Sequence, residues 1–113
     1  MSQSFKNDLI LGNAYRMFVG EIAKHLAFSR ELFWGSKTPG PDQLIEASAR
    51  FHTIRGGAGF FSLTDIASTA AKLENKLKSD NFNLAAEIDH IRDLIQEIEG
   101  FAGQMPAPTP PSE

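Results

Sequence analysis

The sequence predicts an all-α protein, an antiparallel up-and-down four-helix bundle. Four segments carry apolar residues at spacings of three and four, which is the repeat of one helix face. No segment shows the apolar–polar alternation of a half-buried strand, and the short connections between the four segments favour antiparallel neighbours. With 113 residues and 42% hydrophobic residues, the chain can build one core and is too short for a second domain.

The first helix is expected from about residue 13 to residue 33, where the apolar stripe repeats without interruption. A weaker pattern over residues 5–11 allows a short extra helix before it. Glycines and prolines in the connection over residues 34–41 end the first helix, and Pro41 is well placed to open the second. The stripe residues of the first helix are Tyr15, Phe18, Val19, Ile22, Leu26, Ser29 and Phe33.

The second helix begins near Pro41, and its stripe runs into the glycine-rich segment over residues 55–59. A third helix is expected over about residues 64–79, because Ser62 and Asp65 have the spacing of a capping box. The stripe residues are Leu44, Ala47, Phe51, Ile54 and Ala58 in the second helix, and Ile66, Ala70, Leu73 and Leu77 in the third.

The fourth helix follows a polar break at residues 79–83, where Asn83 is a good N-cap. Gly100 and Gly103 weaken its end, and the proline-rich tail cannot bury a core. We therefore expect a domain over residues 1–105 and a linker or tail over residues 106–113. The stripe residues of the fourth helix are Leu84, Ile88, Ile91, Ile95, Ile98 and Ala102.

The composition excludes several classes of function. A formal net charge of -3 provides no basic field for nucleic acid. Without cysteine there is no disulfide and no thiolate chemistry. The longest apolar run near the N-terminus, residues 9–11, is too short for a secretion signal, and no stretch approaches the ~18 consecutive apolar residues of a spanning helix. We expect a cytoplasmic protein with no direct membrane contact.

Three glycines, Gly56, Gly57 and Gly59, interrupt the second helix, where each costs about 1 kcal/mol relative to alanine. Two interpretations are open. The helix can end at Arg55 and the glycines form a loop, since glycine is the usual helix terminator. Alternatively the helix continues, which the core stripe favours because Ile54 and Ala58 extend the face of Phe51.

In a continuous helix, His52 shares a face with Ser48, Arg55, Gly56 and Gly59, which lie three, four or seven residues away. His52 then projects from a surface cleared of neighbouring side chains, which another protein can approach closely. Glycines that weaken a helix at this cost in stability, without an evident structural gain, indicate a functional site.

Two other readings of these residues fit less well. A nucleotide-binding loop would need a preceding strand and a following Gly-Lys-Ser/Thr, and both are missing. A metal site would need clustered ligands, but His25, His52 and His90 fall on three different predicted helices. We therefore predict no metal, and we interpret His25 and His90 as solvated or boundary residues.

The segment Phe51-His-Thr-Ile-Arg-Gly-Gly-Ala-Gly-Phe-Phe-Ser-Leu resembles the signature of histidine phosphotransfer (HPt) domains, in which a histidine is followed by two residues, a lysine and a glycine. The similarity continues into Ile66-Ala-Ser-Thr-Ala-Ala-Lys-Leu-Glu, which is closest in pattern to the phosphotransfer domains of chemotaxis-type histidine kinases. With the helical layout, the resemblance covers most of residues 13–103.

The resemblance implies that His52 is a phosphoacceptor, that Arg55 is its basic neighbour, and that Glu74 hydrogen-bonds and orients the imidazole. Gly56, Gly59 and Ser48 would contact the phosphate or the partner. This sequence departs from the family pattern at three positions. Arg55 replaces a lysine, Ser62 stands where glycine is common, and Ala71 replaces a histidine frequent in chemotaxis-type members.

A phosphotransfer domain is a carrier in a two-component phosphorelay rather than an enzyme. Its implied partners are a histidine kinase catalytic domain and a response-regulator receiver domain, and Mg²⁺ and ATP belong to those partners, so no cofactor is expected here. Two alternatives from other classes remain: a pure interaction bundle in which His52 is incidental, and an independent hydrolase. The sequence shows no second group of polar residues suited to catalysis, which counts against the hydrolase.

Overall fold

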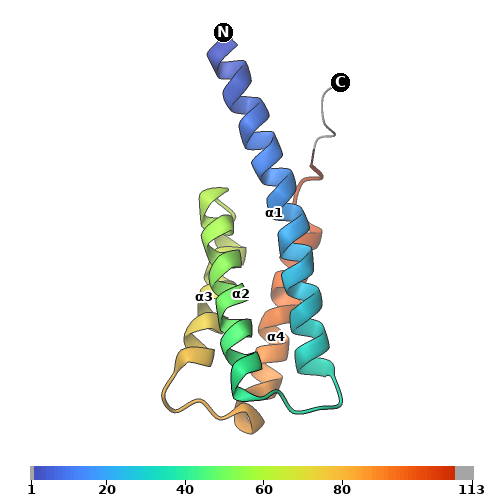
Figure 1. Cartoon of the computed structure of the whole chain (residues 1–113), viewed down its shortest axis with the longest axis vertical. Helices are drawn as coiled ribbons and strands as arrows, with labels where there is room; N and C mark the ends of the chain where they lie inside the picture. The colour runs from blue at the N-terminus through green and yellow to red at the C-terminus, as the bar shows by residue number, and fades with distance from the viewer. Residues whose placement is uncertain (1, 109–113) are drawn as a thin grey trace.

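The computed structural model describes residues 2–108, with side chains from residue 11 onward. The chain forms four helices, α1 (Ser2–Trp34), α2 (Pro41–Phe60), α3 (Thr64–Lys78) and α4 (Leu84–Gly103), and no strand occurs within this range. Successive helices run in opposite directions, and α4 returns beside α1 (Figure 1). The predicted all-α, up-and-down four-helix bundle is confirmed.

The core forms where the four apolar stripes meet. Phe33 from α1, Phe51 from α2, Leu73 from α3 and Ile95 from α4 are each at most 1% exposed. Burial of each such side chain contributes about 1.5–3 kcal/mol, so the stripes that the sequence shows are also what holds the helices together. The other buried apolar residues are Ile22, Leu26, Leu32, Ala47, Ile54, Ala58, Ile66, Ala70, Ile91, Leu94 and Ile98.

The first helix is longer than predicted. A separate short helix over residues 5–11 is wrong, because α1 runs from Ser2 to Trp34 without a break. Gly12 lowers helix propensity, but a single glycine costs only about 1 kcal/mol, and α1 contains no proline and no residue with positive φ. The N-terminal part of α1 projects beyond the other three helices (Figure 1).

Two predicted helix starts are confirmed. Pro41 is the first residue of α2, and the backbone N–H of Gly40 donates to Gln43 Oε1 at 2.9 Å, which satisfies a donor at the helix entry. Asn83 is the N-cap of α4, where its side-chain oxygen accepts from the Ala86 N–H at 3.3 Å. Both starts lie at the same end of the bundle, at the end opposite the α2–α3 turn (Figure 1).

The predicted capping box at Ser62 and Asp65 is wrong. The residue before α3 is Leu63, which makes no side-chain cap, and Ser62 ends α2 instead, with φ of 60°. The Ser62 N–H bonds to the Gly59 carbonyl at 3.1 Å and the Leu63 N–H to the Ala58 carbonyl at 2.8 Å, the bond pattern of a Schellman motif. Ser62 therefore occupies the left-handed position that glycine favours.

Beyond α4, the chain stays beside α1. The Tyr15 hydroxyl donates to the Pro106 carbonyl at 2.7 Å, and Met105 packs partly buried against the core. Residues 109–113 of the predicted tail lie outside the described residues. Within the range that the structure describes, no helix combines the length and apolar character needed to cross a membrane.

Candidate functional site

The α2 helix continues through its glycines to Phe60, so the interpretation that it ends at Arg55 in a glycine loop is wrong. The three glycines meet different surroundings. A Cβ added at Gly56 or Gly59 would meet nothing within 4 Å, whereas one added at Gly57 would lie 2.5 Å from the Phe18 ring of α1. Gly57 therefore permits close packing of α1 on α2, and Gly56 and Gly59 leave open space on the other side of the helix.

His52 projects from this open side of α2, with 66% of its side chain exposed. Its Nδ1 lies 2.9 Å from Oε2 of Glu74, which comes from the neighbouring helix α3. The Glu74 side chain is only 3% exposed. The structure thus brings together the two residues that the resemblance singled out, one at the surface and one buried beneath it.

Two cations also bind the Glu74 carboxylate. Arg55 Nη1 donates to Oε1 at 3.0 Å, and Lys78 Nζ donates to Oε2 at 2.6 Å. The Lys78 ammonium, followed by His52 and Arg55, lowers the pKa of Glu74 below its ordinary value, although burial of the carboxyl acts in the opposite direction. The buried carboxylate is therefore ionised at neutral pH, and both of its oxygens accept hydrogen bonds.

The hydrogen bond to Glu74 defines the tautomer of the His52 ring. An ionised carboxylate accepts hydrogen bonds and cannot donate them, so Nδ1 carries the proton in the 2.9 Å contact. In the neutral ring, Nε2 then bears the free lone pair. Because most of the side chain is exposed and Gly56 and Gly59 leave space beside it, a large reactant can reach this nitrogen.

Ser48, one turn before His52 on α2, is buried, and its hydroxyl has no hydrogen-bond partner within residues 11–108. It lines an open groove of about 730 Å³ between the first half of α2 and the end of α3. The groove is mainly apolar and reaches His52 and Lys78. Its other lining residues are Pro41, Leu44, Ile45, Ala49, Thr53, Leu77, Ser79 and Phe82.

The other histidines lie elsewhere in the bundle. Nδ1 of His25 on α1 lies 3.3 Å from Arg50 Nη1; burial, and secondarily Arg50, lower the pKa of His25. His90 on α4 is exposed, 4.0 Å from Glu87. No group of three or more potential metal ligands occurs in the part of the chain that the structure describes.

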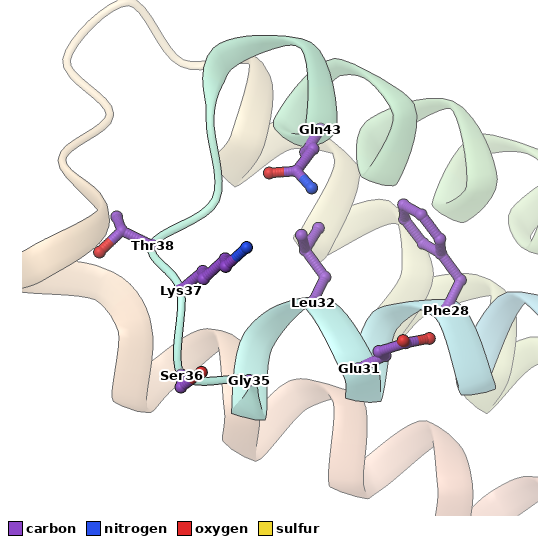
Figure 2. A pocket seen from close by; sticks show the side chains of 8 residues that line it. All are labelled: Phe28, Glu31, Leu32, Gly35, Ser36, Lys37, Thr38 and Gln43. Carbon is purple, nitrogen blue, oxygen red and sulfur yellow. The ribbon is translucent and has the colours of Figure 1, made fainter.

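A second hollow, of about 520 Å³, lies where the α1–α2 connection joins the two helices, as Figure 2 shows. Phe28 and Leu32 from α1, Lys37 from the connection and Gln43 from α2 surround it. None of the residues predicted for the site lines this hollow, so it is separate from the surface around His52.

Sequence reasoning missed Lys78 and the packing role of Gly57. Lys78 lies four residues after Glu74 on α3, and this spacing alone predicts an ion pair on one helix face, so the signal was present. Helical spacing already places Gly56 and Gly59, but not Gly57, on the face of His52. The packing of Gly57 against Phe18 joins residues 39 positions apart, so only the tertiary structure shows what Gly57 contacts.

An exposed histidine whose inner nitrogen is held by a buried carboxylate, on a helical bundle, defines a site suited to covalent modification of the outer nitrogen. Comparison with protein families matches residues 13–101 to the Hpt domain. The chain belongs to this family, whose members are phosphotransfer carriers in phosphorelays and interact with histidine kinases and response-regulator receivers. Neither the curated proteins nor the solved structures gave a match.

Proposed function

We propose that this domain carries a phosphoryl group on Nε2 of His52, accepting it from a histidine kinase or a phosphorylated receiver and passing it to a response-regulator aspartate. The observation that carries the proposal is the pairing of an exposed imidazole with the buried carboxylate of Glu74 at 2.9 Å. The buried Glu74 also supports the closer resemblance to the phosphotransfer domains of chemotaxis-type kinases.

In the transfer from a receiver, the Nε2 lone pair of His52 attacks the phosphorus of the aspartyl phosphate. The P–N bond forms as the P–O bond to the aspartate breaks, and the aspartate leaves as a carboxylate. Positive charge develops on the ring, and the Nδ1 proton remains in its hydrogen bond to Glu74. A carboxylate held in place before the reaction stabilises this charge without reorganisation. Transfer to a receiver reverses the same steps.

Arg55 lies one turn from His52, and 48% of its side chain is exposed. One of its nitrogens is bonded to Glu74, which leaves other donors of the guanidinium for phosphoryl oxygens. We propose that Arg55 compensates charge on the transferred group, the role that lysine has in the family pattern. The geometry differs from that of lysine because the guanidinium is a planar fork.

The receiver must cover the surface around His52, because its aspartate has to reach bonding distance of Nε2. The apolar groove beside His52, with Ser48 in its wall and Ile45 68% exposed at its side, is continuous with this surface. We propose that the receiver docks on this groove and over Gly56 and Gly59. ATP and Mg²⁺ act in the partner domains, where the phosphoryl group originates or is received.

The experiment is a transfer assay with a phosphorylated receiver or an active kinase as donor. The domain is expected to retain a label that is labile in acid and stable in base, as a phosphoramidate is. His52→Gln should abolish labelling, whereas the control variants His25→Gln and His90→Gln should be labelled like the unmodified domain. Undiminished labelling of His52→Gln would refute the proposal, and binding without any retained label would favour a pure interaction bundle.

A further inference from the structure

Two large apolar side chains are exposed on α2, one before His52 and one after it. Ile45 is 68% exposed and Phe60 is 67% exposed. Ile45 lines the groove described above, whereas Phe60 is the last residue of the helix and has no role in the mechanism. A single exposed apolar residue on a protein surface needs no explanation, so the argument depends on how these two are placed.

Helix geometry places both residues on the face of His52. With 3.6 residues per turn, Ile45 lies seven residues before His52 and Phe60 eight residues after it, both within about 80° of His52 around the helix axis. Ala49 and Gly56 lie in the same sector, and both are small and exposed. These five residues form an uncharged strip on α2, with small residues beside His52 and a large apolar side chain at each end.

The length of the α2 strip fits a single folded partner. Ile45 and Phe60 are about 22 Å apart along the helix axis, because each residue adds 1.5 Å. A standard protein interface covers about 800 Å² of each partner, which is roughly 30 Å across. A domain seated over His52 therefore covers both ends of the strip at once.

The charges beside the α2 strip fit a partner that brings an anionic group to His52. Arg55 and Lys78 both bind Glu74 beneath the imidazole, and 48% and 59% of their side chains remain exposed. Exposed cations around the contact point are complementary to a phosphoryl group or an aspartate on the partner. The family to which this chain belongs interacts with response-regulator receivers, and a receiver has this chemistry.

We propose that Phe60 is a second apolar anchor of the receiver-binding surface, so that a receiver seated on His52 contacts the α2 strip from Ile45 to Phe60. The inference rests on the proposed function, which places the receiver on the groove and over the two exposed glycines. Burial of an aromatic side chain at the far end adds binding free energy, because apolar surface is removed from water.

Phe60 also packs edge-to-face on Phe61, with the ring centroids 4.9 Å apart, so the experiment has to separate docking from a structural role. Phe60→Gln removes the apolar surface, and Phe60→Leu keeps an apolar side chain there. The matched control is Met17→Gln, because Met17 is 71% exposed on α1, away from the α2 strip. The probe is a purified receiver domain that serves as donor in the transfer assay.

Three quantities are measured for each variant: the Kd of the receiver by isothermal titration calorimetry, the transfer rate over a range of receiver concentrations, and thermal unfolding. Phe60→Gln should raise the Kd by about 5- to 30-fold, the range for an interface anchor, and reduce the rate at saturating receiver much less. Phe60→Leu should bind more tightly than Phe60→Gln, and Met17→Gln should bind like the unmodified domain. Ile45→Gln combined with Phe60→Gln should multiply the two separate effects, because the anchors are more than about 10 Å apart.

Equal Kd values for Phe60→Gln and Met17→Gln would overturn the proposal. Equally weak binding by Phe60→Leu and Phe60→Gln, with both unfolding at lower temperature, would overturn it in favour of packing on Phe61. Sedimentation of the unmodified domain as a dimer and of Phe60→Gln as a monomer would show that the strip pairs two copies of this chain. Receiver binding that depends on Phe60 but leaves no label on His52 would instead refute the proposed function.

Discussion

The two sides of α2 use the same residue type for opposite purposes. On the core side, Gly57 lets the Phe18 ring approach the helix backbone, and Phe51, Ile54 and Ala58 are fully buried. On the outer side, a Cβ added at Gly56 or Gly59 would meet nothing within 4 Å, and both glycines follow the exposed His52 on the same helix face. A glycine in a helix can therefore serve packing or access, and its neighbours in space decide which.

The largest expected effect comes from filling the open side. Gly56→Gln or Gly59→Gln should reduce transfer by about 10- to 100-fold, because a side chain beside His52 holds the partner's reacting atoms away from Nε2. Stability should be unchanged or raised by up to ~1 kcal/mol, since glycine is the weaker helix former. The measurements are transfer rates and thermal unfolding. The control is Gly100→Gln on α4, where an added Cβ also meets nothing, and where transfer should be unaffected.

On the packed side, the same kind of change should destabilise the fold. Gly57→Ala places a Cβ 2.5 Å from the Phe18 ring, so the ring or the helix must move. We expect Gly57→Ala to be less stable than Gly56→Ala by about 2 kcal/mol, combining overpacking in one variant with improved helix propensity in the other. Denaturant unfolding of the two variants measures this difference. Equal stabilities would mean that Gly57 does not serve packing.

Ser62 follows the end of α2 with a φ of 60°. This left-handed conformation costs free energy in any residue that has a Cβ. Ser62→Gly should therefore raise the free energy of unfolding by about 1 kcal/mol. Transfer by His52 should stay the same, because the change lies in the turn before α3. A loss of stability in denaturant unfolding would contradict the assignment of Ser62 to the left-handed position of the Schellman motif.

The smallest expected effect is on the pH dependence of stability, through the buried carboxylate of Glu74 beneath His52. The pKa of Glu74 is lowered in the folded chain from its ordinary value of 4.5, so its contribution to stability is fully present above that value and is lost as pH falls through the lower folded pKa. Between neutral pH and the acid range, Glu74→Gln should lose less stability than the unmodified domain. Unfolding curves at a series of pH values test this, and parallel pH dependences would contradict it.

The comparison of the two sides also explains how much the sequence could predict. The apolar stripes of all four helices, the starts at Pro41 and Asn83, and the continuation of α2 past Arg55 follow from spacing and cap chemistry within one segment. Ser62 and Asp65 also have the spacing of a capping box. Ser62, however, lies in the left-handed position of the motif that ends α2, so it does not cap α3. The unbroken α1 likewise differs from the prediction because a weak stripe and one glycine do not stop a helix.

For the site, the sequence grouped Ser48, His52, Arg55, Gly56 and Gly59 because they share one helix face. The contact between His52 and Glu74 joins two helices, so it came only from the family resemblance, and no periodicity could have predicted it. Lys78 was overlooked although its spacing from Glu74 is local. Only the folded structure shows which oxygen of the Glu74 carboxylate Lys78 binds.

The central claim is that Nδ1 of His52 is held by Glu74 and that Nε2 receives the phosphoryl group. The most direct test is ¹⁵N and ³¹P NMR of the domain, labelled with ¹⁵N-histidine and phosphorylated by its donor. We predict that one ring nitrogen, Nε2 of His52, couples to phosphorus and that Nδ1 keeps its proton. Phosphorus coupled to Nδ1 of His52, or to a nitrogen of His25 or His90, would contradict the account.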